Sequence, residues 1–156
     1  MPAILGKMNR ISRCAGLYRT EKLQNDELTS RHHSFVLAIC HHPGMSQDQI
    51  ARHLCLNKST VTRALNQLEI KGYVLRMPSK TDKRVTLVYP TEKMLEIFPK
   101  VRAISTEWNE QLAEGISPDE FDLFWSVLVR METRAKELTG ITDTEVGTVT
   151  EKEGEA

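Results

Sequence analysis

One segment of the chain, residues 57–89, gathers side chains suited to hydrogen bonding with nucleic acid. Its first part places hydroxyl, amide and cationic side chains at helical spacing, with apolar residues between them. Arginine suits the acceptor edge of guanine, asparagine or glutamine suits adenine, and lysine pairs with phosphate. The candidate DNA-reading residues of this part are Lys58, Ser59, Thr60, Thr62, Arg63 and Asn66.

The second part of the segment is a basic loop between two β-prone runs, Tyr73–Met77 and Val85–Tyr89. This arrangement predicts a hairpin with a long polar tip. An arginine at such a tip can enter a narrow minor groove, where the potential is most negative, and Asp82 can brace Arg84 by a charge-assisted hydrogen bond. The candidate residues for contact with the backbone or minor groove are Arg76, Lys80, Asp82, Lys83 and Arg84.

Positive charge is concentrated in this segment. Residues 57–84 hold seven Lys or Arg against two acids, a local net charge of +5, although the 156-residue chain has a formal net charge of zero. Residues 103–129 hold six acids and neither Lys nor Arg. Because phosphates dominate the affinity of proteins for DNA, this asymmetry would turn residues 57–84 toward a duplex.

Helical patterns precede this segment and position it. Apolar spacing predicts helices over residues 4–24 and 30–42, and the S-x-x-Q spacing of Ser46 and Gln49 predicts the start of a third helix. Asn57 suits the N-cap of a fourth helix. The apolar stripe of that fourth helix, which would face the core, consists of Val61, Ala64, Leu65 and Leu68.

Two further helices are predicted after the hairpin. The first starts at Pro90-Thr91 and contains Pro99, which is expected to kink or split it. The second starts at Ser117 and carries large apolar side chains, including Trp125. The predicted fold is mainly α with a minor β component, a winged helix-turn-helix. Its predicted parts are an N-terminal helix (1–28), the winged domain (29–90), C-terminal helices (91–138) and a flexible acidic tail (139–156).

The segment and its surroundings resemble the multiple-antibiotic-resistance regulator (MarR) family of transcription factors. The resemblance rests on Ser59–Arg76, on the Asp82-x-Arg84 pattern and on Val85–Lys93, and it extends over about residues 4–138. It implies a homodimer whose first, fifth and sixth helices form the dimerisation platform, with Arg84 as the wing arginine and Asp82 as its brace. It also implies a repressor that releases DNA on binding a small ligand or on oxidation.

The apolar side chains of the last two helices favour a dimer independently, since they exceed what a small winged domain needs. A two-fold dimer would favour a pseudo-palindromic operator with half-sites about one helical turn apart. The alternative is that these helices fold back as a cap within one chain.

Three release signals are considered. An aromatic acid-like effector is what the resemblance implies. Cys14, with Arg10 and Arg13 beside it, is the candidate for thiol oxidation, whereas Cys40 and Cys55 are expected to be structural. A metal is disfavoured because adjacent histidines such as His32 and His33 point in different directions on a helix.

Other classes of protein lack support in the sequence. Hydrolase, metalloprotease and phosphate-loop motifs are absent, so neither an enzyme nor a cofactor is expected. No apolar run is long enough to cross a bilayer, and the odd, widely spaced cysteines favour a reducing compartment, so the predicted location is the cytoplasm. The alternative without DNA is a winged-helix protein-interaction module. The sequence specifies neither the operator, nor the effector, nor the sign of regulation.

Overall fold

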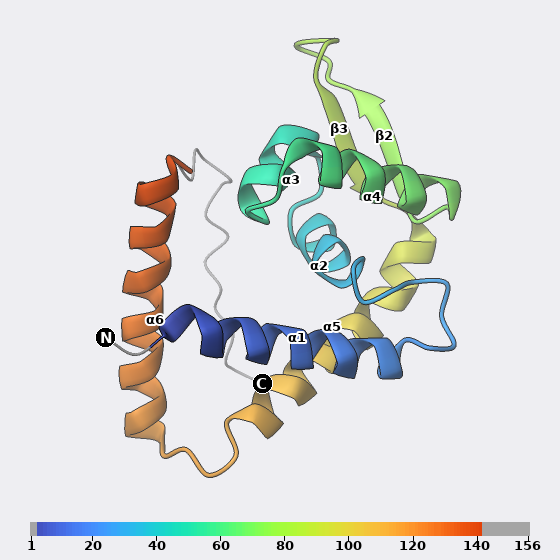
Figure 1. Ribbon diagram of the computed structural model, residues 1–156. Coiled ribbons are helices and arrows are strands. Elements are labelled where there is room, and N and C mark those ends of the chain that lie inside the picture. The colour runs from blue at the N-terminus through green and yellow to red at the C-terminus, as the bar shows by residue number, and fades with distance from the viewer. Residues whose placement is uncertain (1–2, 142–156) are drawn as a thin grey trace.

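The computed structural model describes residues 3–141, which form a mainly helical structure with one small antiparallel sheet (Figure 1). This confirms the predicted fold class. Of the predicted tail, residues 142–156 lie outside the described residues. Among the described residues, no helix is both long and apolar enough to span a bilayer. The elements are α1 (Ile4–Lys22), α2 (His33–His41), β1 (Met45–Ser46), α3 (Gln47–His53), α4 (Lys58–Ile70), β2 (Val74–Pro78), β3 (Thr86–Pro90), α5 (Glu92–Leu112) and α6 (Pro118–Thr139).

Side-chain caps fix where α3, α4 and α6 begin, at the positions that the sequence predicts. The Ser46 hydroxyl accepts a hydrogen bond from the Gln49 backbone N–H, and the Gln49 side chain accepts one from the Ser46 N–H, which makes a capping box at α3. Asn57 caps α4, and Ser117 forms a second capping box at α6. Gly72 follows α4 with a φ of +77°, a left-handed conformation that glycine adopts without steric cost. Both ends of α4 are therefore defined.

The sheet joins the hairpin to the start of α3. β2 and β3 form the predicted hairpin, with a register that runs from Val74 opposite Pro90 to Pro78 opposite Thr86. β1 pairs with the other edge of β3, which gives the strand order β1-β3-β2. β1 is not predicted from the sequence, because a two-residue strand carries no alternating pattern. Val88 of the central strand is fully buried, so the hairpin is anchored in the core.

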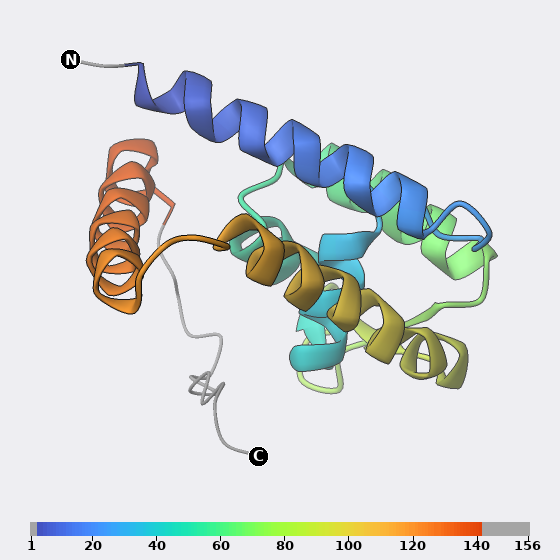
Figure 2. The same cartoon turned by 90° about the horizontal axis from the view of Figure 1, so that it is seen from below.

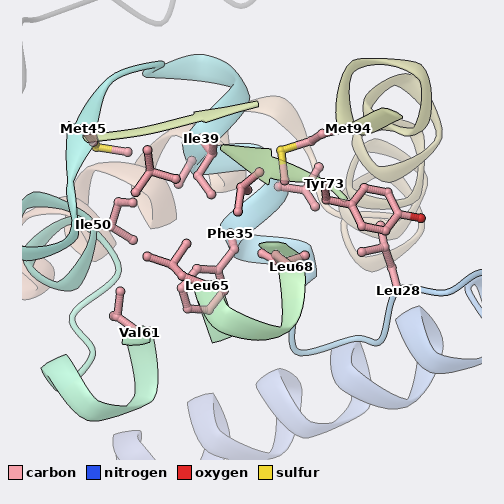
Figure 3. Packing of buried hydrophobic residues seen from close by; sticks show 14 of the residues in the cluster. Leu28, Phe35, Ile39, Met45, Ile50, Val61, Leu65, Leu68, Tyr73 and Met94 are labelled. Atoms are coloured by element: carbon pink, nitrogen blue, oxygen red, sulfur yellow. The ribbon is translucent and has the colours of Figure 1, made fainter. Parts of the chain in front are cut away.

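The hydrophobic core lies between α2, α3, α4, the sheet and the start of α5 (Figure 3). Val61, Leu65 and Leu68 of the predicted stripe are fully buried, and Ala64 is half-buried. Phe35 on the central helix α2 is buried in the same cluster. Burial of one large apolar side chain contributes about 1.5–3 kcal/mol, so this core fixes the direction in which the polar face of α4 points.

The other long helices differ in how much they bury. α5 continues without a break through Pro99, so the predicted split is wrong, and its Val101 and Ile104 are buried. Within the described chain, Ala15 is the one residue of α1 that is buried. No residue of α6, all of which is described, is buried, and Figures 1 and 2 show this helix standing apart from the others. The chain thus combines a packed winged domain with two helices that bury little.

Three lysines fasten the loop between α1 and α2 to the winged domain. Lys100 on α5 pairs with Asp26 at 2.7 Å, and Lys93 on the same helix pairs with Glu27. Lys71, which follows α4, donates to the Glu27 backbone carbonyl. The Lys93 hydrogen bond lowers the pKa of the Glu27 carboxyl, so the pair is ionised at neutral pH. These contacts therefore hold the loop in place against both α4 and α5.

Candidate nucleic-acid interface

The outer face of α4 carries the predicted DNA-reading side chains. Because the apolar stripe of the helix is buried, the opposite side faces solvent. Lys58, Ser59, Thr62, Arg63 and Asn66 are exposed there, and Thr60 is half-buried. Across residues 3–141, the Arg63 and Asn66 side chains make neither a hydrogen bond nor an ion pair, which leaves their donors and acceptors open to a ligand.

The other side chains of this face are partly engaged. Lys58 pairs with Asp48 of α3 at 3.0 Å, and the Ser59 hydroxyl donates to the Asn57 side chain at 2.8 Å. The Thr62 hydroxyl donates to the Lys58 backbone carbonyl at 2.9 Å. Exposed ion pairs such as that of Lys58 contribute at most about 1 kcal/mol, so a phosphate can compete for this ammonium group.

The hairpin tip presents the predicted wing cations. The side chain of Arg84 is 94% exposed, and Lys80 and Lys83 are exposed beside it. Asp82 Oδ1 accepts a hydrogen bond from the Arg84 backbone N–H at 3.0 Å and lies 3.5 Å from the Arg84 Nε atom. Asp82 therefore holds the backbone of Arg84 more closely than its guanidinium, which stays available to a ligand.

Arg76 differs from the other predicted wing cations because the protein already surrounds it. Its side chain is 22% exposed and forms an ion pair with Glu69 near the end of α4. The Arg76 Nη1 atom also donates to Gln47 Oε1 of α3 at 3.2 Å. Hydrogen bonding to Glu69 raises the pKa of Arg76, and the same bond lowers the pKa of Glu69. This geometry favours a role in holding α3, α4 and the wing together.

The helix face and the hairpin lie on the same side of the molecule. Figure 1 shows α4 and the β2–β3 hairpin on the side opposite α1. A shallow groove runs between the start of α3 and the base of the wing, so that Arg84 lies at its edge. Its lining residues are Ser46, Gln47, Asp48, Arg84, Val85 and Thr86. The structure therefore places the helix and the hairpin, which carry the two predicted sets of residues, on the same side of the molecule.

Two histidines that the sequence analysis weighed as metal ligands are buried. His33 on α2 lies between α1 and α5, with Ser105 Oγ 3.0 Å from its Nε2 and Arg19 Nη1 3.5 Å from its Nδ1. Burial, assisted by the Arg19 charge, lowers the pKa of His33 to about 4. The His32 Nε2 atom lies 3.1 Å from Gln67 Oε1. Over the part of the chain that is described, no group of three or more His, Cys, Asp or Glu side chains could hold a metal ion.

The three cysteines lie in different surroundings. Cys14 on α1 is exposed, and Cys40 is half-buried, which raises the pKa of its thiol to about 11. Cys55 is also exposed and has a φ of 52°, so its expected structural role gains no support from burial. Burial keeps the Cys40 thiol protonated and therefore a poor nucleophile at neutral pH.

A family model described as the MarR family matches residues 28–86, from the loop before α2 to the start of β3. The part of this chain that holds α2, α3, α4 and β2 therefore matches the MarR family. The resemblance predicted from the sequence is confirmed. MarR proteins are transcriptional regulators and not enzymes, which agrees with the expectation that the chain has no catalytic role.

Similar proteins extend this resemblance over most of the chain. The uncharacterized HTH-type transcriptional regulator YybA of Bacillus subtilis (strain 168) is 24% identical over 131 residues, which cover 84% of this chain and 87% of YybA. The crystal structure of the transcriptional regulator SlyA is similar with a TM-score of 0.84 at 25% identity, covering 86% of this chain and 95% of that one. The S. aureus MepR-DNA complex is similar in fold, with a TM-score of 0.79 at 20% identity, covering 86% of this chain and 99% of MepR.

Proposed function

We propose that this protein is a sequence-specific DNA-binding repressor that acts as a homodimer and responds to a small ligand. The observation that carries the proposal is the shared surface of α4 and the wing. It joins open hydrogen-bonding groups, Arg63 and Asn66, to the exposed cations of the hairpin tip. The first can contact base edges while the second grip phosphates or the minor groove.

The division of roles follows from geometry. α4 is short, polar on its outer face and rigidly seated, as a helix must be to lie in a major groove. The wing tip extends beyond it and carries Lys80, Lys83 and Arg84. A protein of the same fold, MepR, has been crystallised in complex with DNA, which supports this use of the fold.

A homodimer is proposed because α1 and α6 expose apolar faces. Contiguous apolar patches on soluble proteins commonly mark protein–protein interfaces. A second copy covering these helices would bring two winged domains to one duplex and favour a pseudo-palindromic operator. The exposed apolar residues of these two helices include Ile4, Leu5, Met8, Ile11, Phe121, Leu123, Phe124 and Trp125.

The proposed release signal is an aromatic acid-like effector bound between the dimer helices and the winged domain. The alternative is oxidation of the Cys14 thiol, which is exposed on α1. Peroxide treatment of a Cys14→Ser protein discriminates between the two signals. A Cys14→Ser protein that still releases DNA under peroxide would exclude direct sensing by Cys14.

The test of DNA binding compares two arginines. Arg84→Ala should weaken binding to DNA selected from a random pool and lower the slope of log affinity against log salt by about 1, because one phosphate contact is lost. Arg102→Ala, on α5 away from the wing, removes the same charge and should leave the slope unchanged. Fluorescence anisotropy at several salt concentrations measures both.

Base reading is tested separately. Arg63→Ala or Asn66→Ala should reduce discrimination at one base pair by about 1–3 kcal/mol, because a specific pair of hydrogen bonds is lost. Competition with single-base variants of the selected site measures this loss. A wild-type protein that selects no DNA would contradict the proposal and favour the protein-interaction module instead.

A further inference from the structure

A chain of side-chain hydrogen bonds connects the wing to the recognition face of α4 through α3. Arg76 of β2 donates from Nη1 to Gln47 Oε1 at 3.2 Å. Gln47 Nε2 donates to the Thr62 hydroxyl at 3.4 Å, which is the longest link. Thr62 in turn donates to the Lys58 backbone carbonyl at 2.9 Å. Three elements that are far apart in sequence therefore meet at Gln47, a residue that the sequence analysis did not single out.

The direction of each bond in this chain is fixed by chemistry. The Arg76 guanidinium can only donate, so the carbonyl oxygen of Gln47 must face it and the amide nitrogen must face Thr62. The Thr62 proton is used by the Lys58 carbonyl, so the Thr62 oxygen is free to accept from Gln47. A reversed Gln47 amide would place two donors against each other at Arg76.

The wing end of the chain is held firmly. Glu69 accepts from the Arg76 Nε atom at 3.0 Å and pairs with a second guanidinium nitrogen of the same residue. Both contacts are to one carboxylate oxygen, Glu69 Oε2, and these charge-assisted bonds restrict the guanidinium. Because Glu69 belongs to α4 and Arg76 to β2, the Arg76 side chain is held between these two elements. From there its Nη1 atom donates to Gln47.

We propose that Gln47 is a positioning residue for sequence recognition, which orients Thr62 on α4 relative to the wing. Through Thr62 it narrows the set of bases that the helix accepts, and it acts without being a base-reading residue itself. The inference rests on the proposed DNA binding. It assigns Arg76 to the support of this bridge and leaves the direct backbone contacts to Arg84 and its neighbours.

The test separates positioning from simple contact by using two substitutions of Gln47. Gln47→Met keeps the length of the side chain and removes both bonds. Gln47→Glu still accepts from Arg76 but cannot donate to Thr62 when it is ionised. Gln24→Met, at an exposed residue before α2, is the matched control. Affinity is measured for the selected site, for its single-base variants and for scrambled DNA.

Gln47→Met and Gln47→Glu should both reduce discrimination among the single-base variants, by about threefold to tenfold for the loss of one hydrogen bond. Gln47→Met should leave affinity for scrambled DNA unchanged, because no charge is altered. Gln24→Met should change neither quantity. Thermal unfolding of all variants identifies any that lose the fold, and Gln47→Glu then serves in place of Gln47→Met.

A double-mutant cycle with Thr62→Val makes the test decisive. If Gln47 acts through Thr62, the combined variant should discriminate no worse than Thr62→Val alone. Effects that multiply independently would overturn the inference, as would an equal loss of affinity for every DNA after Gln47→Met. Unchanged discrimination by both Gln47 variants would also overturn the inference. The proposed function would still stand in that case, provided that the wild-type protein selects a DNA site. Absence of any DNA binding by the wild type would remove both.

Discussion

The helices α4 and α6 share two sequence features and differ in what they bury. Both begin with a side-chain cap, and both carry large apolar residues at helical spacing. In α4, Val61, Leu65 and Leu68 are fully buried, whereas in α6 Phe124 and Trp125 remain 56% and 54% exposed. An amphipathic pattern therefore indicates that a helix face needs a cover, and it does not indicate whether the same chain supplies that cover.

This difference divides the molecule into a part that is complete in one chain and a part that is not. The winged domain encloses its core between α2, α3, α4 and the sheet. α6 leaves its apolar face open to solvent within the described chain. The three predictions that follow test this division.

The largest effect is expected at Trp125. If a second copy covers α6, Trp125→Glu places an unpaired charge in an apolar interface and should dissociate the dimer. Ile70→Glu introduces the same charge at a residue of α4 that is 86% exposed, and it should leave the dimer intact. Light scattering measures the mass of each variant. A Trp125→Glu protein that remains dimeric would place the interface elsewhere.

The packing of α2 against α1 and α5 should weaken in acid because of His33, which lies between these two helices. Burial lowers the pKa of His33 to about 4, below its ordinary value of 6.5, so the unfolded chain binds the proton first as pH falls. The stabilisation is complete above about pH 6.5 and is lost as pH falls toward 4, by up to about 3 kcal/mol. Urea unfolding from pH 7.5 to 4.5 measures the loss.

A matched pair of variants isolates the contribution of this histidine. His33→Gln removes the titrating group, so its stability should fall less over the same pH range than that of the wild type. His41→Gln, at an exposed position on the same helix, should follow the wild type. Parallel curves for His33→Gln and wild type would show that other groups dominate the acid response.

The smallest effects are expected at the two helix caps. Asn57→Ala should lower the free energy of unfolding of the winged domain by about 1 kcal/mol at any protein concentration. Ser117→Ala removes a similar bond at α6, so its cost should appear in dimer stability and should depend on concentration. Unfolding curves at two protein concentrations measure both, and equal concentration dependence would argue against the division.

Much of the fold could be predicted because signals within a few residues determine where several helices begin. The caps at Ser46, Asn57 and Ser117 occur at the predicted residues, since each depends on atoms within one turn. The strand β1 could not be predicted, because two residues have no periodicity and pair with β3 only after the chain folds back. Pro99 is a strong local signal that did not split the helix, since α5 continues through it.

The residue types of the candidate site could be predicted from the sequence, but the contacts that these residues make with one another could not. The polar face of α4 follows from helical spacing once the apolar stripe is known. Arg76 was grouped with the other wing cations because charge alone does not tell which cation meets Glu69 or Gln47 in the folded chain. No local pattern marks Gln47, whose partners lie 15 and 29 residues away in sequence.

The two tryptophans of the chain lie on different helices, α5 and α6. Trp108 of α5 lies beside Tyr18 of α1, with ring centroids 5.3 Å apart, and Trp125 stacks on Phe121 in α6. Indole emission depends on contact with water, so each of these two helices carries its own optical probe. With Trp108 replaced by phenylalanine, the remaining tryptophan fluorescence comes from α6 alone. The wavelength of its emission maximum then reports how far Trp125 is exposed to water, and no added dye is needed.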